Sequence, residues 1–487
     1  MTVISVRNAY TGEYDYEFTQ ATADQVRETC ARVRSGQAEW AALGVEGRIA
    51  VLQEFAAAVT ENFAAIAGAL KTDEARAAIA EYEVAYLTPL VERMAGDARK
   101  MLVDPAPRPA MLPGIEGSGQ WVPYEVVGCI GPWNFPFLLI MFDSVPALLA
   151  GSAVVAKPSE VNPRFVEPVR AALAQVPKLA EVFDFVMGPG ETGAELINHV
   201  DLVVFTGSVR TGRIVGEAAA RNFIPAFLEL GGKDPAIVLE SANIEAATSC
   251  VLRASVGATG QACQSLERIY VADSIHDEFV DKVVEKAKGV TLNIDRLEQG
   301  HLGPLIFEKQ ASIIQDHLDD AVAKGAKILT GGKIIEKGGK WIEPTVLTHV
   351  NHDMKVMTEE TFGPVIPIMK FKTVDEAIAL ANDTIYGLSG SVFAGSAEEA
   401  MAVARRMNAG AISINDGSLT AFVNDVPNES FGFSGLGGTR FGSEGILRFV
   451  RLKSFLNNVV GPTDVDNKIV PLDPTAAPTI DAPSRPT

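Results

Sequence analysis

The stretch "FLELGGKDPAIVLE", Phe227 to Glu240, decides the class of fold, because two short apolar runs meet there around a glycine pair. Runs of the same kind precede it in "SAVVAKPSE" (152–160), "VFDFVMG" (182–188) and "DLVVFTGS" (201–208), and helical segments lie between them. Short apolar strands that alternate with helices are typical of successive βαβ units in a parallel sheet. The sequence therefore predicts an α/β protein.

The flanking segments indicate that this α/β chain forms at least two lobes. Residues from about 22 to 100 are rich in alanine and carry apolar side chains at helical spacing, and a proline-rich segment, 104–119, follows them. A second αβ region extends from about Gly257 to Asn415. A length of 487 residues exceeds a single ordinary core, and two lobes usually leave a cleft that binds ligands.

Composition argues against several classes of function. The chain has 61 acidic and 42 basic residues, and its formal net charge of −19 disfavours binding to nucleic acid or to an anionic membrane. The most apolar stretch, 135–155, is broken by Asp143, Pro146 and Gly151, so it predicts a buried helix and strand and not a membrane span. The N-terminus has neither the basic start nor the apolar core of a signal peptide.

Cysteine and histidine usage favours a reducing compartment without metal chemistry. The four cysteines are far apart and form no CxxC pair, which argues against a disulfide framework or a zinc site; they are Cys30, Cys129, Cys250 and Cys263. The six histidines are scattered along the chain. We therefore expect a cytoplasmic protein that uses no metal and that binds neither nucleic acid nor membrane.

Three motifs contain side chains suited to acyl chemistry. Cys263 lies in a turn-like step of "ATGQACQSLERIYV" (258–271), which leaves a nucleophile room to meet a substrate; an inert core thiol is the alternative. Glu229 lies between two leucines, and such apolar surroundings would raise its pKa towards general-base work. Asn134 in "GPWNFPF" (131–137) suits an oxyanion donor, or equally a side chain that satisfies the backbone of a turn.

Two glycine-containing loops raise the question of a nucleotide cofactor. "GPGETG" (188–193) matches G-x-G-x-x-G but lacks the acidic residue expected about 20 positions later, so an ordinary strand-to-helix turn explains it as well. "FTGSVRTG" (205–212) places backbone amides where a helix would begin, in position to face a pyrophosphate. By itself, this second loop is equally compatible with a plain connection.

Two pairs of side chains are also suited to a nucleotide. Lys157 and Glu160 follow a strand, at the edge where ligands of parallel sheets bind, and they either hold ribose hydroxyls or form an ordinary ion pair. In "EETFGPV" (359–365), Glu360 and Phe362 offer a hydroxyl-binding acid and a flat apolar face. A surface acid beside a core phenylalanine is the alternative there.

The order of these motifs is more specific than any one of them. From about residue 5 to residue 460, the sequence resembles the aldehyde dehydrogenase superfamily in the order and spacing of "PWNFP", "KPSE", "FTGSVRTG", "LELGGK", "GQACQSLER" and "EETFGPV". The segments "YGLSGSVF" and "GAISIND" add to the likeness. The resemblance implies an aldehyde dehydrogenase-like α/β fold, with a Rossmann-type cofactor domain, an α/β catalytic domain and a small β oligomerisation element.

The resemblance implies boundaries for these parts. The NAD-binding domain is expected at 1–104 and 124–229 and the catalytic domain at 230–431. The oligomerisation element is expected at 105–123 and 450–460, where it would assemble a homodimer or homotetramer. Residues 461–487 are expected to form an extended C-terminal tail.

The resemblance further implies NAD(P)-dependent oxidation of an aldehyde to the acid. Cys263 would attack the aldehyde carbon, Asn134 and the Cys263 backbone N–H would hold the oxyanion, and Glu229 would activate the water that hydrolyses the thioester. Glu160 would accept hydrogen bonds from a ribose 2′-hydroxyl, which favours NAD, although NADP is also possible. The residues expected at the cofactor are Trp133, Lys157, Glu160, Gly207, Ser208, Gly212, Leu230, Glu360 and Phe362.

The substrate tunnel implied by the resemblance is mostly apolar. Its expected lining residues are Phe135, Leu138, Leu139, Phe142, Gln264, Val426 and Phe431. Such a lining suits an aromatic or a medium to long aliphatic aldehyde. No basic residue is evident for a carboxylate-bearing semialdehyde, and Arg440 and Arg448 are not assigned to the tunnel, but a semialdehyde remains the alternative substrate.

Three other functions are considered beside this one. Relatives that release the acyl group to coenzyme A typically lack the glutamate found at Glu229, which favours hydrolysis. A cofactor-independent cysteine esterase would need none of the cofactor residues in their places. An NAD-binding scaffold with a decayed site would not keep every catalytic position.

Overall fold

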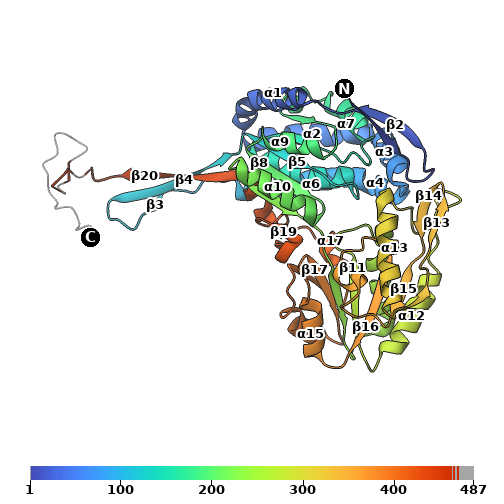
Figure 1. Ribbon diagram of the computed structural model, residues 1–487. Helices are drawn as coiled ribbons and strands as arrows, with labels where there is room; N and C mark the ends of the chain where they lie inside the picture. Colours follow the sequence, from blue (N-terminus) through green and yellow to red (C-terminus); the bar gives the residue numbers. More distant parts are fainter. Residues whose placement is uncertain (1, 463, 467–468, 471–487) are drawn as a thin grey trace.

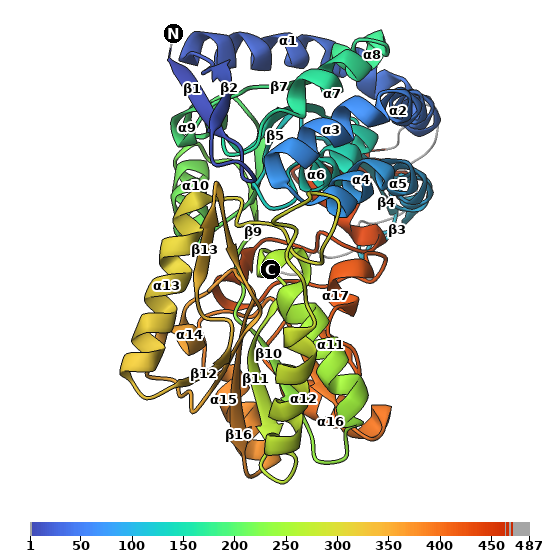
Figure 2. The ribbon, with the colours of Figure 1, turned by 90° about the vertical axis from the view of Figure 1, so that its right-hand side faces the viewer.

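The computed structural model describes residues 2–462, 464–466 and 469–470, which form two α/β lobes and a thin projecting arm (Figure 1). Most of the expected C-terminal tail, 461–487, lies outside the described residues. Figure 2 shows the first lobe, with the N-terminus, stacked against the second lobe along one long axis. The predicted α/β class is confirmed.

The first lobe is built on a six-stranded sheet in the order β19-β9-β8-β5-β6-β7. Five of its strands are parallel, and only β19 runs antiparallel, against β9. In chain order the strands are β5 Val126–Ile130, β6 Ala153–Lys157, β7 Phe183–Phe185, β8 Leu202–Thr206, β9 Ala226–Glu229 and β19 Gly435–Leu436. The predicted runs at 152–160, 182–188 and 201–208 and the first run of 227–240 therefore form strands of this sheet, whereas the second run of 227–240 forms a strand of the other lobe.

Helices cover this sheet, and five of them come from the alanine-rich N-terminal region. They are α1 Ala23–Ala42, α2 Gly44–Glu61, α3 Phe63–Glu74, α4 Ala77–Ala85 and α5 Leu87–Met101. The others connect the strands as α6 Pro136–Ala150, α7 Val166–Leu173, α8 Pro177–Ala180, α9 Gly190–Ile197 and α10 Val209–Arg221. Within the described residues, no single helix has the length and apolarity of a membrane span. Only taken together do α2 and α3, which are bent by 69° to each other, have that length and apolarity.

The second lobe contains a seven-stranded sheet in the order β12-β15-β16-β11-β10-β17-β18. Its strands are β10 Asp234–Val238, β11 Leu266–Ala272, β12 Lys327–Thr330, β15 Thr345–Thr348, β16 Val365–Phe371, β17 Ser389–Phe393 and β18 Ala411–Ile414. All pair in parallel except β12. The helices are α11 Ile244–Val256, α12 His276–Lys288, α13 Glu308–Ala323, α14 Lys355–Thr358, α15 Val374–Asn382, α16 Ala397–Ala404 and α17 Leu419–Phe422.

Smaller elements join and extend the lobes. The projecting arm is a three-stranded sheet of β3 Arg108–Pro109, β4 Ile115–Pro123 and β20 Val450–Asn458, drawn from the two segments expected to assemble subunits. The N-terminal hairpin, β1 Val3–Arg7 with β2 Tyr14–Thr19, reaches the second lobe, where Tyr10 donates a hydrogen bond to the Ile294 carbonyl at 2.7 Å. A second hairpin pairs β13 Ile334–Lys337 with β14 Gly339–Ile342.

The C-terminal segment returns to the first lobe before it enters the arm. It contains two of the three short 3₁₀ helices of the described residues, Gly432–Ser434 and Ser443–Phe449, and the third is Gly257–Gly260. The helix Ser443–Phe449 buries Ile446 and Phe449 in the core of the first lobe. The boundaries expected from the sequence assign residues 432–449 to no domain, whereas the structure builds them into the first lobe through β19 and this 3₁₀ helix.

The direction of the strands in the two sheets brings the predicted motifs together where the two lobes meet. In the first lobe they follow the carboxyl ends of parallel strands, since Asn134 comes after β5, Lys157 ends β6 and Glu229 ends β9. In the second lobe they precede strands, since Cys263 comes just before β11 and Glu360 before β16, and β11 pairs with β16. The carboxyl ends of one sheet therefore face the amino ends of the other.

Candidate active site

Cys263 lies in an irregular turn between the 3₁₀ helix Gly257–Gly260 and β11. Ala258 and Thr259 have left-handed backbone angles, φ of 53° and 62°, which non-glycine residues rarely adopt. Gly260 follows with φ of 66°, and a Cβ there would lie 2.2 Å from the Gly363 carbonyl carbon. The turn is thus held in a strained form that packs against segment 360–363.

The Cys263 thiol is half-buried and surrounded by more acids than bases. Burial raises the pKa of Cys263 to about 12, and Asp234 and Glu360 add to the rise while Arg440 opposes it. A thiol with this pKa is almost entirely protonated at neutral pH, so it needs a base or an added positive charge to become the nucleophilic thiolate.

Asn134 reaches the cysteine turn from the other lobe. Its side chain is buried, and Nδ2 donates a hydrogen bond to the Gln261 carbonyl oxygen at 3.0 Å. The backbone carbonyl of Asn134 accepts a hydrogen bond from Arg76. Arg76 also pairs with Glu74 at 2.6 Å, both side chains being at most 3% exposed. The Asn134 side chain is therefore bonded to the backbone two residues before Cys263, and a buried ion pair holds the Asn134 backbone.

The same ion pair belongs to a larger buried group that sequence analysis missed. Glu83 accepts hydrogen bonds from the Phe137 and Leu138 amides, at 3.2 and 2.9 Å, which are free donors at the start of α6. Burial raises the pKa of both Glu83 and Glu74. The group lies in the alanine-rich helices α3 and α4, whose apolar spacing alone gave no sign of it.

Glu229 ends β9 with its side chain 19% exposed. Its Oε2 accepts a 3.5 Å hydrogen bond from the Ser430 hydroxyl, and its Oε1 lies 3.8 Å from Arg448 Nη1. Burial raises the pKa of Glu229, and the positive charges of Arg440 and Arg448 limit the rise. A carboxylate with this raised pKa is suited to accept a proton.

The arginines beside Glu229 are held by Asp143, the only charged residue between Asn134 and Lys157. Arg440 contacts Asp143 through Nε at 3.2 Å and Nη2 at 2.5 Å, and Arg448 Nη2 contacts it at 3.1 Å. All three side chains are at most 5% exposed. The sequence interpretation left both arginines unassigned, yet the structure buries them beside the base. A lone acid in an apolar helix was the one available signal.

The residues expected at the adenosine ribose lie at the end of β6. Lys157 Nζ donates to the Pro158 carbonyl at 2.7 Å and lies 3.4 Å from Glu160, whose side chain is 41% exposed against 5% for the lysine. Burial lowers the pKa of Lys157. The "GPGETG" loop lies beside them, since a Cβ on Gly193 would be 3.3 Å from Lys157 Cδ. Glu160 is thus paired with Lys157 but exposed enough to face a ligand.

The loop expected at the pyrophosphate leads into α10. Ser208 is the N-cap of this helix and accepts a 3.3 Å hydrogen bond from the Thr211 amide. A Cβ on Gly207 would lie 2.4 Å from the Phe205 ring, and one on Gly212 would lie 2.4 Å from Leu230. A side chain at either position would require Phe205 or Leu230 to move, and the backbone amides at the start of α10 are of the kind that binds an anion.

The residues expected at the nicotinamide end meet between the lobes. Phe362 packs edge-on against Trp133, with ring centroids 5.3 Å apart. Glu360 Oε1 accepts a 3.1 Å hydrogen bond from the Gly232 amide, and a Cβ on Gly231 would lie 2.3 Å from Glu360 Oε2. Burial and the negative charge of Glu267 raise the pKa of Glu360 to about 8.

The expected tunnel residues fall into three groups. Leu138 and Phe142 are buried in α6, and the Phe142 ring contacts Tyr86 and Phe441 at centroid distances of 5.8 and 6.1 Å. Val426 and Phe431 lie in an exposed loop. The remaining three are half-buried: Phe135 with its ring beneath the Arg76 guanidinium, Leu139 with its carbonyl bonded to Arg440, and Gln264. Within the described residues, Gln264 Oε1 is buried without a hydrogen-bond partner.

The described part of the chain contains no group of three or more His, Cys, Asp or Glu side chains arranged to hold a metal ion.

Comparisons with known proteins agree on one family. The sequence profile of the "Aldehyde dehydrogenase family" matches residues 1–455. A Mycolicibacterium smegmatis protein, provisionally named succinate-semialdehyde dehydrogenase [NADP(+)], is 37% identical over 450 residues, 91% of this chain and 86% of that protein. The crystal structure described as the aldehyde dehydrogenase PutA from Anabaena variabilis is 52% identical and superposes with a TM-score of 0.93, covering 95% of this chain and 99% of that one.

A further solved structure was determined with a nucleotide bound. Betaine aldehyde dehydrogenase from Staphylococcus aureus in complex with NAD+ is 30% identical, with a TM-score of 0.89 and coverage of 95% of this chain and 93% of that chain.

Proposed function

The chain belongs to the aldehyde dehydrogenase family, and on this premise we propose that it oxidises an aldehyde to the carboxylic acid through a covalent intermediate on Cys263, with NAD(P) as hydride acceptor. The supporting observation is the meeting of three groups from two lobes. The Cys263 turn is bonded to the Asn134 amide, and Glu229 lies near enough to Cys263 to raise the pKa of its thiol.

The residues on the cofactor side fit a dinucleotide. Glu160 and Glu360 supply carboxylates for ribose hydroxyls, the start of α10 supplies amides for a pyrophosphate, and Trp133 with Phe362 supplies a flat apolar wall. The bound nicotinamide would supply a positively charged ring that accepts a hydride. Both NAD+ and NADP(+) appear in the names of similar proteins, and the exposed Glu160 carboxylate favours NAD, since it would repel a 2′-phosphate.

The residues of the chain divide the chemistry among them. The Cys263 thiolate attacks the aldehyde carbon, and Asn134 Nδ2 with the Cys263 backbone N–H stabilises the oxyanion that forms. After oxidation, a thioester remains on Cys263 Sγ. Glu229 accepts a proton from the water that attacks this thioester, and its raised pKa makes it a stronger base than an exposed glutamate.

The substrate preference follows from the charges around the tunnel. Arg440 and Arg448 are the cations nearest to Glu229, and together with Asp143 and Glu229 they form a group of two positive and two negative charges. Neither arginine is left over for a substrate carboxylate. We therefore favour a neutral aromatic or aliphatic aldehyde, in keeping with the aromatic rings around Phe142.

A carboxylate-bearing semialdehyde is the second candidate. It is favoured by the name of the Mycolicibacterium smegmatis relative and by the presence of two arginines near the site. Rates of NADH and NADPH formation with hexanal, decanal, benzaldehyde and succinic semialdehyde decide between the two. The first candidate predicts a higher kcat/KM for the uncharged aldehydes, and a preference for succinic semialdehyde would replace it with the second.

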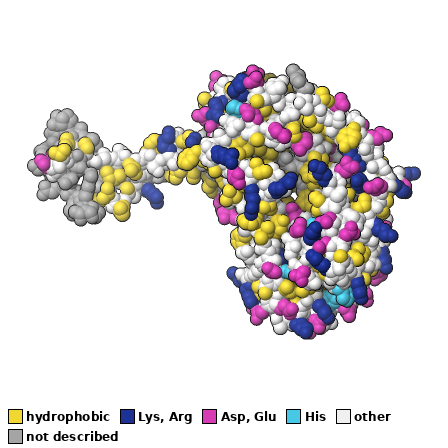
Figure 3. Space-filling view, in the orientation of Figure 1, with side chains coloured by type: hydrophobic (Ala, Val, Ile, Leu, Met, Phe, Trp, Pro, Cys, Tyr) yellow, Lys and Arg dark blue, Asp and Glu magenta, His cyan; other side chains and the backbone are white. Residues whose placement is uncertain are grey.

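The projecting arm supports assembly with a second copy of the chain. Strand β20 is the edge of its sheet, its residues from 451 to 457 are exposed, and they include Leu452, Phe455 and Leu456. Figure 3 shows hydrophobic side chains gathered along the arm. An exposed apolar edge strand favours pairing with another chain. Light scattering is expected to give a dimer or tetramer, and Leu456→Asp is expected to lower the mass towards the monomer.

A further inference from the structure

A buried ion pair joins the two segments that follow the proposed reacting side chains Glu229 and Cys263. Lys233 follows Glu229 by four residues and Glu267 follows Cys263 by four residues, and Lys233 Nζ lies 2.6 Å from Glu267 Oε2. The two side chains are 0% and 3% exposed. Because desolvation cancels much of the attraction within a buried pair, such a pair is weak evidence of a gain in stability. Its hydrogen bonds to other groups indicate what it does.

Those hydrogen bonds converge on the segment that carries Glu360. Glu267 accepts the Thr361 amide at 2.8 Å and the Phe362 amide at 2.7 Å, one on each carboxylate oxygen. Lys233 adds a 3.0 Å hydrogen bond to the Thr361 hydroxyl. Hydrogen bonds with a charged partner are shorter and stronger than neutral ones. One ion pair therefore fixes two successive amides and one hydroxyl of this segment.

The fixed segment contains a strained residue. Phe362 has φ of 52°, the left-handed region that bulky side chains avoid. Such a conformation persists where its surroundings determine it, and here Glu267 binds the Phe362 amide while Trp133 packs against the ring. Without the Glu267 carboxylate, the backbone of Phe362 would lose the contact that holds its amide in this orientation.

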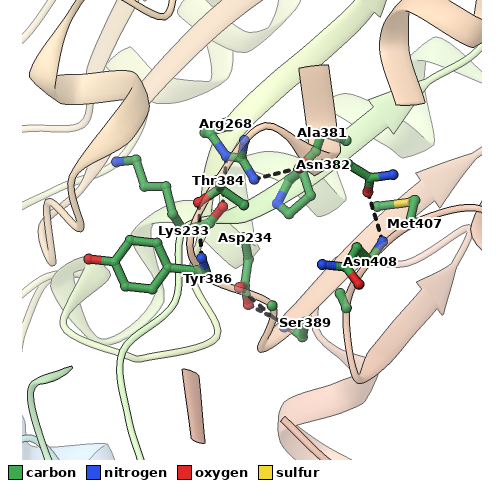
Figure 4. Close-up of a pocket in the computed structure, with 13 residues that line it drawn as sticks. Lys233, Asp234, Arg268, Ala381, Asn382, Thr384, Tyr386, Ser389, Met407 and Asn408 are labelled. Carbon is green, nitrogen blue, oxygen red and sulfur yellow. Dashed lines mark hydrogen bonds between the residues drawn. The ribbon is translucent and has the colours of Figure 1, made fainter. Parts of the chain in front are cut away.

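Neighbouring groups hold Lys233 in place from the opposite side. Arg268 donates to the Lys233 carbonyl at 2.7 Å and to the Ala381 carbonyl at 2.9 Å, and Asp234 is bonded to Ser389. Figure 4 shows the Lys233 side chain extending away from Asp234 and Ser389. The backbone of Lys233 is thus anchored in the second lobe. Glu267 is the carboxylate to which its ammonium group donates a hydrogen bond.

We propose that Lys233 and Glu267 are positioning residues that hold Thr361 and Phe362 in the conformation that receives the nicotinamide end of the cofactor. This inference rests on the proposed function. Through the pair, the loop that carries the base and the strand that follows the nucleophile are tied to the cofactor segment. Neither side chain touches the reacting atoms, so their loss affects cofactor binding before it affects the thiol.

Two substitutions test this role. Glu267→Gln keeps the shape of the side chain but turns one acceptor into a donor, which opposes either the Thr361 or the Phe362 amide. Lys233→Met removes the charge and keeps the length. Each is expected to raise the Kd for NAD, measured by calorimetry, by about tenfold or more, because the first opposes a buried donor and the second leaves the Glu267 carboxylate buried without its partner. Lys370→Met, at an exposed pair with Asp273, is the matched control and should leave Kd unchanged.

Two further readouts separate positioning from a general structural role. Amide hydrogen exchange of the cofactor-free protein should accelerate at residues 361 and 362 in both variants, with the remaining sheet amides unchanged. Hydrolysis of an activated aryl ester by Cys263, which needs no nicotinamide, should stay within about twofold of wild type. Unchanged Kd and unchanged exchange would overturn the inference, and so would a loss of ester hydrolysis together with a large fall in Tm.

The proposed function is tested by a different result. If the wild-type chain binds neither NAD nor NADP, the proposed function fails, and the exchange rates at 361 and 362 still decide whether the pair holds the segment. If the wild type binds NAD and the variants bind it equally well, the proposed function stands and the inference falls.

Discussion

On the side of Cys263 that carries Glu229, one buried and one half-buried carboxylate lie among two buried arginines, whereas on the side that carries Glu360 three buried or half-buried carboxylates lie with one lysine and one arginine. The first group is Glu229, Asp143, Arg440 and Arg448, and the second is Glu360, Glu267, Asp234, Lys233 and Arg268. On the balanced side, the two arginines limit the rise that burial causes in the pKa of Glu229. On the other side, the pKa of both Glu360 and Asp234 rises to about 8.

This difference suits the two tasks. A general base has to lose and regain a proton, so arginines that limit the rise of its pKa keep Glu229 available near neutral pH. Acids of raised pKa in a cofactor pocket respond to positive charge, since a bound, positively charged nicotinamide would lower the pKa of these acids and of the Cys263 thiol. The four predictions below test whether the two sides act separately.

The largest effect is expected from Cys263→Ala, which belongs to neither side. Aldehyde oxidation should fall below detection because no covalent intermediate forms, while the Kd for NAD stays within about twofold, since the pockets beside it are intact. NADH absorbance and calorimetry measure the two quantities. Residual turnover would remove the thiol from the mechanism, and a parallel loss of NAD binding would show that the two sides are not separate.

Glu229→Gln should affect only the balanced side. Thioester hydrolysis is expected to slow by about 10²- to 10⁴-fold, the usual contribution of a general base, while the oxidation step survives. Stopped-flow absorbance should then record a burst of NADH near one equivalent per active site, followed by slow turnover. Absence of the burst would instead assign Glu229 to activation of the Cys263 thiol.

Asp143→Asn should slow thioester hydrolysis less than Glu229→Gln does. Removal of this charge leaves Arg440 and Arg448 with Glu229 as their nearest carboxylate, so the pKa of Glu229 falls and the base weakens. We expect thioester hydrolysis to be about tenfold slower at pH 8, and the acid limb of its pH–rate profile to move to lower pH. The burst of NADH should remain intact. Asp277→Asn, at a fully exposed side chain, is the control. An unmoved pH profile would leave Asp143 with a packing role only.

The smallest effect concerns the acid-rich side and stability. Asp234 has its pKa raised to about 8 by burial, so the folded chain holds a proton there that the unfolded chain loses near pH 4. Between these pH values the folded state binds more protons, and stability contributed by this group falls as the pH rises. Asp234→Asn does not titrate, so its Tm relative to wild type should increase by a few degrees from pH 5 to pH 9. Parallel Tm curves would contradict this assignment.

Local patterns were sufficient for the framework of the fold. The apolar runs around Val154, Val204 and Ile237 became parallel strands because short, fully buried β segments have few alternatives between turn residues. Helical spacing located the N-terminal helices for a similar reason. Residues 432–449 escaped assignment because their pairing partner, β9, lies about two hundred positions earlier in the chain.

Part of the candidate site was also accessible from sequence. Cys263, Glu229 and Asn134 stood out because each is a reactive or polar side chain in a short motif with a restricted backbone. Asp143 appeared only as an interruption of an apolar helix. Its partners Arg440 and Arg448 are about three hundred residues away, and no local pattern links them to it.

The sequence by itself determined the alternation of strands and helices, the order of the motifs and the choice of candidate reactive side chains, because these depend on residues close together in the chain. Only the tertiary structure decided which charges neighbour which acid. The Asp143 cluster, the Arg76–Glu74 pair behind Asn134 and the Lys233–Glu267 pair behind Phe362 each join separate segments in a buried environment. There the pKa of a carboxyl depends on distance and desolvation, which the packing of the two lobes sets.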